Sequence, residues 1–464
     1  TQSLIYETMG LRTVFKGGVV SGKFNVDLTP EFVVRLASSF GTELDPGVVV
    51  TLGRDASRSA RVAKRAMTAA LLSTGVNVRD LRAAHVGVVR HDVLAGKSVA
   101  GAQVRAGEDP DEVEILFFSS GATPITESDQ RAIEKVFVRE EYRRAHGADI
   151  GDLIFPGRAM EQYVERLMRA ANRQKTQGAT LVVDFSGGVA SLVASLVFER
   201  LAVNAVVMEG FTNANAAGVP GTGTSLADAL DRVGSVVPTV EAAFGAVVGP
   251  TGEDVQFVDD SGEFVPADVM LACFLERLRP RKAVLPVNLS RAYQELIKKH
   301  GGTLEQSRTS LGNVALKAAE ERADVAGLVD GRYVFPAFLP APDCFMTLAR
   351  ALELFREEPL SGVRSRFGET FGDVRRRRLE CPWGAKGRVM RGLAEKFGGD
   401  PDAILTDGVK LNLDEGWVLM LPDPDNPLFY VYAEADAGSQ DGKDGSEGLV
   451  LKYAELVEDL IKSG

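Results

Sequence analysis

Cysteine, histidine and tryptophan are scarce in this chain of 464 residues, which contains 3 Cys, 4 His and 2 Trp. Cys273, Cys344 and Cys381 lie far apart and form no CxxC pair, which argues against a disulfide framework and against a structural zinc site. The histidines are equally scattered, with no HExxH motif. Scattered single cysteines are typical of a reducing compartment, so the sequence predicts a cytoplasmic protein.

Long apolar runs and excess positive charge are also lacking. No apolar run approaches the roughly 18 residues of a membrane span, and the first residues do not have the pattern of a secretory signal. Lys and Arg number 53 against 64 Asp and Glu, which gives a formal net charge of −11 at pH 7. Because nucleic-acid binding needs Lys and Arg to displace the counterions of phosphate, we expect neither a nucleic-acid nor a membrane partner.

The chain does contain alternating short apolar strands and amphipathic helices, the pattern of an α/β protein of about three domains. Three strand-then-helix units stand out, at 48–52 with 59–74, at 181–184 with 190–201, and at 283–287 with 289–300. A glycine-rich stretch at 218–225 has no GK[ST] ending, so we interpret it as a connection that Ser225 caps at the start of a helix. A phosphate-binding loop is the alternative there.

The last hundred residues differ from the rest. They predict a hairpin of strands 407–413 and 416–420, a third strand at 429–435, a loop at 438–448 and a closing helix at 449–461. The four arginines at 375–378 are interpreted as a solvated edge strand, with an anion site as the alternative.

Seven short segments occur in an order that is recognisable. They are Leu28-Thr29-Pro30-Glu31, Gly53-Arg54-Asp55, the block from Asp109-Pro110 to Phe117-Phe118, Val258-Asp259-Asp260-Ser261-Gly262, Pro340-Ala341-Pro342-Asp343, Gly416-Trp417-Val418-Leu419 with Pro422, and Tyr432-Ala433-Glu434. On these the chain resembles the α-D-phosphohexomutase family (phosphoglucomutase and phosphomannomutase) over nearly its whole length. The resemblance implies α/β domains at 1–150, 151–275 and 276–365, each with a mixed sheet, and an α+β domain at 366–464, around a central cleft.

The chemistry of that family needs a serine that carries a phosphoryl group, a magnesium ion, an acidic loop that grips the sugar, and a loop that clamps the second phosphate. The resemblance assigns these parts to four segments of this chain. We call them the serine segment (105–110), the metal segment (249–254), the sugar segment (327–332) and the phosphate segment (421–427).

Each segment departs from the family pattern at its functional positions. The serine position is Gly107, which has no hydroxyl, and Glu108 and Asp109 follow it. The sequence therefore predicts no catalytic residue there.

Three alternating carboxylates hold the metal in the family, but the corresponding residues here are Gly249, Thr251 and Glu253. One carboxylate from three holds a six-coordinate ion poorly. A site rebuilt from Glu253, Asp254 or Asp259 is the alternative.

In the sugar segment, Leu328 replaces the family's glutamate, while Asp330 and Arg332 remain able to contact a polar ligand. In the phosphate segment, Leu421 replaces the arginine, and Asp423 and Asp425 stand where hydroxyl donors are expected. Carboxylates repel a phosphate.

These departures led us to the hypothesis of a catalytically degenerate protein with a structural, regulatory or oligomerising role and no cofactor. Residues 335–343 and Cys381-Pro382-Trp383 resemble the mutase-like half of bacterial two-part proteins, whose other half is a mannose-1-phosphate guanylyltransferase. That predicts a link to GDP-mannose-type metabolism, with a sugar nucleotidyltransferase as partner, or self-association. The alternative is an active phosphoglucomutase or phosphomannomutase with relocated catalytic groups, which would use Mg²⁺. A third reading is a sensor of sugar nucleotides or sugars.

Overall fold

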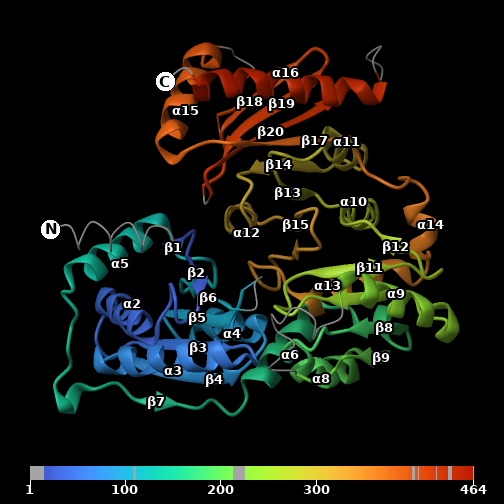
Figure 1. Ribbon diagram of the computed structural model, residues 1–464. Helices are drawn as coiled ribbons and strands as arrows, with labels where there is room; N and C mark the ends of the chain where they lie inside the picture. The colour runs from blue at the N-terminus through green and yellow to red at the C-terminus, as the bar shows by residue number, and fades with distance from the viewer. Residues whose placement is uncertain are drawn as a thin grey trace.

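The computed structural model describes residues 15–462 except 108–110, 213–224, 400–402, 406, 425 and 437–441. Four β-sheets follow one another along the chain, each with its own helices (Figure 1). This is the mixed α/β architecture that the sequence predicts. The residues at which one domain gives way to the next stay a prediction.

The first sheet has seven strands in the order β1-β2-β6-β5-β3-β4-β7. Its strands are β1 (Phe15–Lys16), β2 (Val19–Lys23), β3 (Val49–Arg54), β4 (Asn77–Ala83), β5 (Ala100–Ala106), β6 (Glu112–Phe118) and β7 (Leu153–Ile154). Its helices are α2 (Pro30–Glu43), α3 (Arg58–Ser73), α4 (Val86–Asp92), a π-helical turn at Val93–Lys97, α5 (Glu127–Arg139) and a 3-10 turn at Gly147–Asp149. Helices α2, α3 and α5 share one core with the sheet, whereas α4 packs into a different core.

The second sheet has five strands in the order β12-β11-β10-β8-β9. Its strands are β8 (Thr180–Asp184), β9 (Asn204–Met208), β10 (Gly245–Val248), β11 (Val255–Val258) and β12 (Phe264–Val265). Its helices are α6 (Ala159–Ala170), α7 (Arg173–Thr176), α8 (Ser191–Leu201), α9 (Leu226–Val236) and a 3-10 turn at Pro238–Val240. Ser225 caps α9, as predicted, through a bond from the Asp228 N–H to its hydroxyl, while residues 218–224 lie outside the described residues.

The third sheet has the order β14-β13-β15-β16. Its strands are β13 (Lys282–Pro286), β14 (Thr303–Ser307), β15 (Val325–Gly327) and β16 (Tyr333–Val334). The helices of this region are α10 (Ala267–Leu278), α11 (Arg291–Lys299), α12 (Leu311–Glu320), α13 (Cys344–Phe355) and α14 (Leu360–Arg364).

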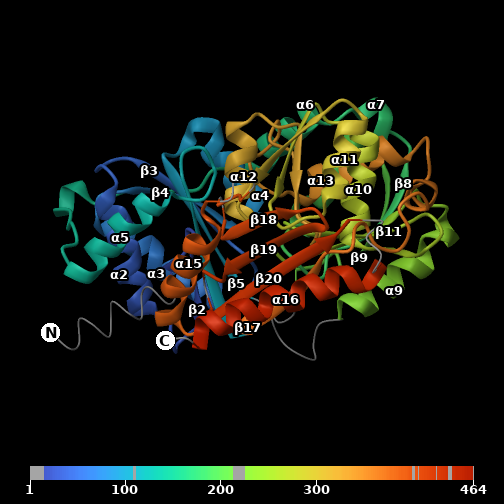
Figure 2. The same ribbon diagram turned by 90° about the horizontal axis from the view of Figure 1, so that it is seen from above.

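The fourth sheet is antiparallel throughout, in the order β17-β20-β19-β18. Its elements are β17 (Arg375–Glu380), α15 (Trp383–Phe397), β18 (Val409–Leu413), β19 (Gly416–Pro422), β20 (Leu428–Ala435) and α16 (Gly442–Lys462). Helices α15 and α16 cover one face, and the other face is turned toward the rest of the molecule (Figure 1). Seen from above, β17 forms an edge of this sheet (Figure 2).

The first three sheets share a hydrophobic core, whereas the fourth sheet has its own. One continuous core contains side chains from the first three sheets, among them Phe118 of β6, Leu181 of β8 and Leu285 of β13. The fourth sheet has a separate core beneath α15 and α16. It meets the third sheet through a small cluster in which Trp417 and Leu419 pack with Val287. Hydrophobic burial therefore joins the first three sheets far more extensively than it joins the fourth.

Most elements lie where the sequence predicts them. The three strand-then-helix units are β3 with α3, β8 with α8, and β13 with α11, and the C-terminal hairpin is β18 with β19. The arginines at 375–378 are exposed on an edge strand, as predicted. The predicted loop at 438–448 is wrong from residue 442 onward, where α16 has already begun. Ser446, within it, is buried and accepts a hydrogen bond from the backbone N–H of Ala435.

Within the described ranges, the structure contains no helix with the length and apolar character needed to cross a membrane.

Candidate active site

Three of the four assigned segments meet in space, although they belong to three different sheets. A salt bridge with an N–O distance of 2.6 Å joins Arg105 of the serine segment to Glu253 of the metal segment. At the end of the metal segment, the backbone N–H of Val255 donates to the carbonyl oxygen of Gly331 in the sugar segment at 2.9 Å. These contacts bring together segments that are about 75 to 150 residues apart along the chain, as an active site between domains requires.

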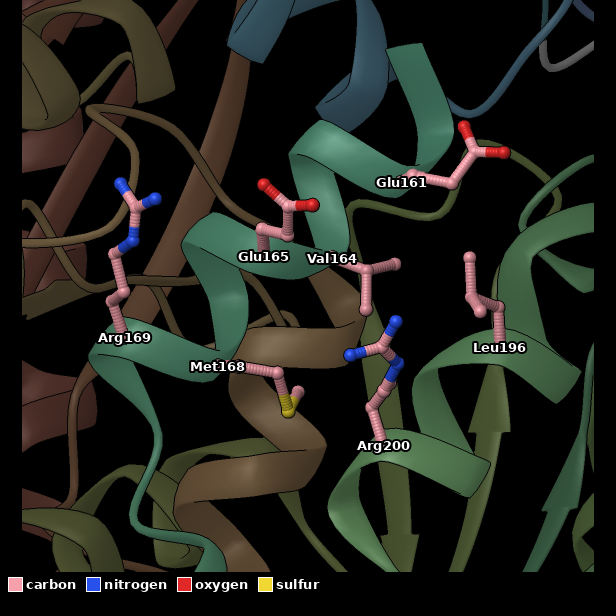
Figure 3. A pocket seen from close by; sticks show the side chains of 7 residues that line it. All are labelled: Glu161, Val164, Glu165, Met168, Arg169, Leu196 and Arg200. Carbon is pink, nitrogen blue, oxygen red and sulfur yellow. The ribbon is translucent and has the colours of Figure 1, made fainter. Parts of the chain in front are cut away.

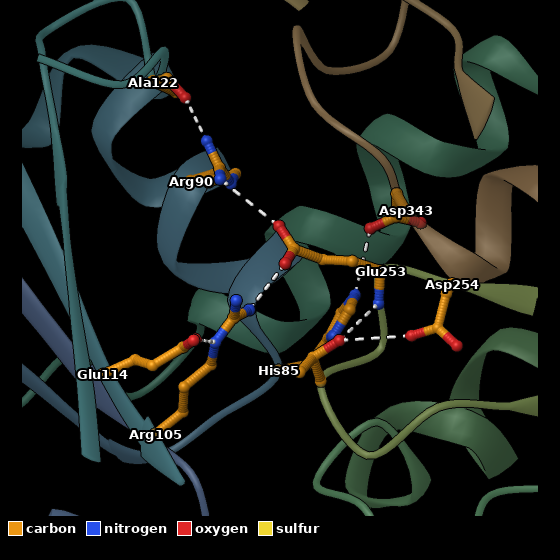
Figure 4. A network of polar contacts seen from close by, with 9 residues as sticks. His85, Arg90, Arg105, Glu114, Ala122, Glu253, Asp254 and Asp343 are labelled. Carbon is orange, nitrogen blue, oxygen red and sulfur yellow. Dashed lines mark hydrogen bonds and ion pairs between the residues drawn. The ribbon is translucent and has the colours of Figure 1, made fainter. Parts of the chain in front are cut away.

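Glu253 is the centre of a buried ion-pair network (Figure 4). Its Oε2 accepts a hydrogen bond from Arg105 Nη1 at 2.6 Å, and its Oε1 accepts one from Arg90 Nη2 at 3.3 Å. Arg105 Nε also donates to Glu114, and Arg90 Nη1 donates to the carbonyl oxygen of Ala122. Burial alone would raise the pKa of the Glu253 carboxyl, but the two guanidinium groups outweigh burial and lower that pKa to about 2.

A hydroxyl, a carboxyl and a third guanidinium lie beside this network. Thr251 Oγ1 accepts from the backbone N–H of Glu253 at 3.3 Å and lies 3.4 Å from Asp254 Oδ1, to which it can donate. Burial raises the pKa of the Asp254 carboxyl, and the positive charge of Arg332 offsets part of that rise. Arg332 itself forms a salt bridge with Asp330 of the same segment.

A second buried cluster joins α4, α6 and α13. His85 Nε2 lies 3.0 Å from Asp343 Oδ2, and the Tyr163 hydroxyl donates to both oxygens of Asp343 at 2.8 and 2.9 Å. Asp343 also caps α13, because its Oδ1 accepts from the backbone N–H of Met346. No local sequence pattern signals this cluster, because its members are up to 258 residues apart. Arg90 was missed for the same reason.

Gly107, at the serine position, has no room for a side chain. Its N–H donates to the carbonyl oxygen of Glu112 at 3.0 Å. A Cβ atom at Gly107 would lie 2.6 Å from Glu112 Cβ and 2.8 Å from its Oε2. Glu108 and Asp109 lie outside the described residues. A phosphoryl acceptor in this protein therefore has to come from another position.

The serines that follow β6 do not replace the missing one. Because β5 and β6 are antiparallel, with Gly107 beside the start of β6, Ser119 and Ser120 lie at the opposite end of the strand. The hydroxyl of Ser119 is engaged with that of Thr123 at 2.8 Å.

The leucine of the sugar segment packs into the protein. Leu328 is partly buried against the core of the third sheet, and its N–H donates to the carbonyl oxygen of Arg332. The polar groups of this segment are therefore those of Asp330 and Arg332, about 38% exposed each.

The phosphate segment is folded upon itself. Leu421 is buried at the end of β19. Asp423, which the sequence suggested would repel a phosphate, accepts hydrogen bonds from the Asn426 N–H at 2.9 Å and from its side-chain amide at 3.3 Å. Burial and a hydrogen bond to Asp423 raise the pKa of the Tyr430 hydroxyl. Asp425 lies outside the described residues.

The residues of the metal segment do not fit a bound Mg²⁺. Gly249 and Thr251 have no carboxylate, and both oxygens of Glu253 are held by arginines. Asp259 is not drawn into this site, because it forms a salt bridge with Arg364. Among the residues that the structure describes, no group of three or more His, Cys, Asp or Glu is placed to hold a metal ion.

A cavity of about 200 Å³ between α6 and α8 lies apart from these segments (Figure 3). Its charged lining is Glu161, Glu165, Arg169 and Arg200. None of the residues assigned to the four segments lines it, so it is not the candidate site.

Comparison with known proteins supports the phosphohexomutase resemblance. Residues 12–144 match the family model described as phosphoglucomutase/phosphomannomutase, alpha/beta/alpha domain I. A phosphoglucomutase/phosphomannomutase family protein of Burkholderia thailandensis has a TM-score of 0.78 at 19% identity, covering 98% of both chains. The chain therefore has the four-domain phosphohexomutase fold.

Proteins that are similar in sequence over most of this chain have names that state an activity. A protein of Pyrococcus abyssi named "Probable phosphoglucosamine mutase" is 26% identical over 457 residues, covering 94% of this chain and 96% of the relative. One of Methanopyrus kandleri with the same name is 27% identical over 430 residues, covering 90% and 93%. An N-acetylphosphoglucosamine mutase of Aspergillus fumigatus, solved with GlcNAc-6P and magnesium, has a TM-score of 0.57 at 11% identity over 99% of both chains.

These relatives overturn our hypothesis of a catalytically degenerate protein, because proteins that match nearly the whole chain are named as mutases. The physical error lay in judging each segment by its own side chains. Positive charge is present at the site, from Arg105 and Arg332 within the serine and sugar segments and from Arg90 outside all four segments. Asp423, in turn, is engaged within its own loop. The expectation that no cofactor is needed stays a prediction.

Proposed function

We propose that this protein is a phosphohexomutase that interconverts the 1- and 6-phosphates of a hexose or hexosamine, using groups other than those of the family's pattern. The observation that carries the proposal is the meeting of the serine, metal and sugar segments around Glu253. The full-length similarity to proteins named phosphoglucosamine mutase favours an amino sugar as the substrate class.

Thr251 is our candidate for the phosphoryl acceptor. It supplies a hydroxyl inside the charged network, with the Asp254 carboxyl 3.4 Å away as proton acceptor. Burial raises the pKa of Asp254, which makes its carboxylate a stronger base. The guanidinium groups of Arg105 and Arg332 provide fixed positive charge for the transferring phosphoryl group.

The proposed reaction balances in two transfers. The 6-hydroxyl of a hexose 1-phosphate attacks phosphorylated Thr251, the bond from phosphorus to the threonine oxygen breaks, and the sugar proton passes through Asp254 to that oxygen. The 1-phosphate of the resulting bisphosphate then returns to Thr251 by the reverse changes, which leaves hexose 6-phosphate. A hexose 1,6-bisphosphate supplies the first phosphoryl group.

The test is a coupled assay of purified protein with glucosamine, glucose and mannose 1-phosphates. Each is supplied with its 1,6-bisphosphate, in the presence of Mg²⁺ and separately with EDTA. Turnover of at least one substrate well above the enzyme-free blank is the expected result. The absence of turnover with all three overturns the proposed function.

The role of Thr251 has its own test. We expect Thr251→Val to reduce kcat by at least 100-fold and to abolish the phosphothreonine found by mass spectrometry after incubation with bisphosphate. Ser119→Ala, which removes a hydroxyl at the far end of β6, is the matched control and should leave kcat unchanged. Full activity of Thr251→Val would place the acceptor elsewhere.

Three earlier expectations stay predictions beside this proposal. They are the cytoplasmic location, the partnership with a sugar nucleotidyltransferase and self-association. Co-purification of the protein with a guanylyltransferase from its own source tests the second, and light scattering tests the third.

A further inference from the structure

The four arginines of β17 are divided between two faces of the fourth sheet by the register with β20. Arg376 lies opposite Tyr432, and Arg378 lies opposite Tyr430. Arg377 lies opposite a side chain of the core that α15 and α16 cover. Residues that are directly opposite in an antiparallel pair share a face. Arg376 and Arg378 therefore stand on the face turned away from the helices (Figure 1).

These two arginines form no ion pair in the described part of the chain, although Glu380 stands on the same face of the strand. Arg375 forms a salt bridge with Asp373 at 2.8 Å, whereas no carboxylate in the described part of the chain is paired with Arg376 or Arg378. Both are exposed. An unpaired guanidinium offers up to five N–H donors in a plane that matches two oxygens of a phosphate.

Two tyrosines of β20, Tyr430 and Tyr432, lie on the same face beside these arginines. The Cζ atom of Arg376 lies 5.4 Å from the centre of the Tyr430 ring, a cation–π contact that restricts the guanidinium to the plane above the ring. The rings of Tyr430 and Tyr432 are 6.1 Å apart. Asp423 lies beside Tyr430, whose hydroxyl donates to its carboxylate. Glu380 and Glu434 stand on the same face, and Glu434 is engaged with the hydroxyl of Ser290.

We propose that Arg376 and Arg378 bind the phosphate group of a hexose phosphate, in place of the arginine that the phosphate segment lacks. Residues two apart on a strand are about 7 Å apart, so their long side chains can converge on one phosphate. A polyanion fits this face less well, because two cations stand on a molecule of net charge −11. The choice of a hexose phosphate as the ligand rests on the proposed function, whereas the position of the site does not.

Isothermal titration calorimetry with glucosamine 6-phosphate and with inorganic phosphate tests the site. We expect Arg376→Ala and Arg378→Ala each to weaken the binding of glucosamine 6-phosphate about tenfold, since each removes a charge-assisted hydrogen bond. Arg377→Ala removes the same charge from the other face of the same strand, and should change the Kd by less than about twofold. Asp423→Asn should tighten binding, because it removes the negative charge beside Tyr430.

The outcomes separate this inference from the proposed function. Turnover with unaltered binding in Arg376→Ala and Arg378→Ala, or an equal loss in Arg377→Ala, overturns the phosphate site alone. Binding that depends on Arg376 and Arg378 in a protein without turnover supports the site and overturns only the mutase proposal. Binding of heparin or a polyaspartate peptide without binding of either phosphate compound overturns the phosphate site. The melting temperature of each variant shows that it is folded.

Discussion

Glu253 shows how a single side chain can change the meaning of a sequence segment. In the sequence it is one remaining carboxylate of a weakened metal site. In the structure it is 3% exposed and bonded to Arg90 of α4 and Arg105 of β5. Sequence reasoning located the segment correctly but not these partners, because Arg90 precedes Glu253 by 163 positions and no local pattern signals such a contact.

Replacing Glu253 with Gln should destabilise the protein strongly. The change leaves the buried guanidinium of Arg90 without its counter-charge and leaves Arg105 with Glu114 alone, for which we expect a loss of about 3–5 kcal/mol in the free energy of unfolding. Urea denaturation measures it. The matched control is Glu127→Gln, which removes an exposed partner of Arg131 on a helix and should have almost no effect. Equal effects of both changes would contradict the buried network.

The pKa of Glu253 predicts a pH dependence with a definite sign. Its pKa is about 2 in the folded protein, below the ordinary value of 4.5. The unfolded chain therefore takes up a proton first as the pH falls, so the stabilisation is complete above about pH 4.5 and is lost toward pH 2. We expect the difference in urea midpoint between wild type and Glu253→Gln to be constant from pH 7 to pH 5 and to shrink below that range.

Restoring a serine at Gly107 should not restore the family's acceptor. The added Cβ would meet Glu112 at 2.6 Å, so we expect Gly107→Ser to cost about 1–3 kcal/mol in stability. Combining it with Glu112→Ala removes the polar end of that side chain, including the oxygen 2.8 Å away, and should recover part of the loss. Thermal denaturation of the single and double variants measures this. A fully stable Gly107→Ser would contradict the crowding.

At the scale of helices and strands, periodicity was a sufficient guide wherever an element has one buried face. The strand at 181–184 and the helix after it were predicted within one residue of β8 and α8, since their apolar spacing matches the buried positions. The start of α16 was not predicted, because residues 442–448 are rich in Gly, Ser and Asp. Tertiary contact overrides that composition, as the bond from Ala435 to Ser446 illustrates.

Helix α13 provides a test of how one capping residue joins separate elements. Asp343 caps the helix and also accepts the hydrogen bonds of Tyr163 from α6. Asp343→Ala should therefore cost about 3 kcal/mol, more than the roughly 1 kcal/mol of a cap alone, because it leaves buried polar groups without partners. Tyr163→Phe, which removes one hydroxyl and leaves the cap, should cost about 1 kcal/mol. Urea denaturation distinguishes the two.

At the scale of the whole molecule, the fourth sheet depends on a few polar contacts with the third. Glu434 of β20 accepts from the backbone N–H of Arg291, at the start of α11, at 2.9 Å, and the indole N–H of Trp417 in the neighbouring β19 donates to the same carboxylate at 2.8 Å. It also accepts from the hydroxyl of Ser290. These contacts accompany the small cluster of Val287 with Trp417 rather than a large shared core.

Glu434→Ala should release the fourth sheet before the other three unfold. We expect the fluorescence of Trp417, which is fully buried, to shift at lower urea than the circular dichroism of the whole protein. Small-angle scattering should show a larger radius of gyration in the same range. Asp436→Ala, which breaks only the partly exposed salt bridge to Arg291, is the control and should keep the two transitions together.

The continuous core and the network around Glu253 have a kinematic consequence. We expect them to hold the first three sheets together as one body. The chain passes from these sheets to the fourth through residues 365–374, between α14 and β17. A rotation of the fourth sheet about this connection would change the distance between the two ends of any molecule held between the fourth sheet and the rest.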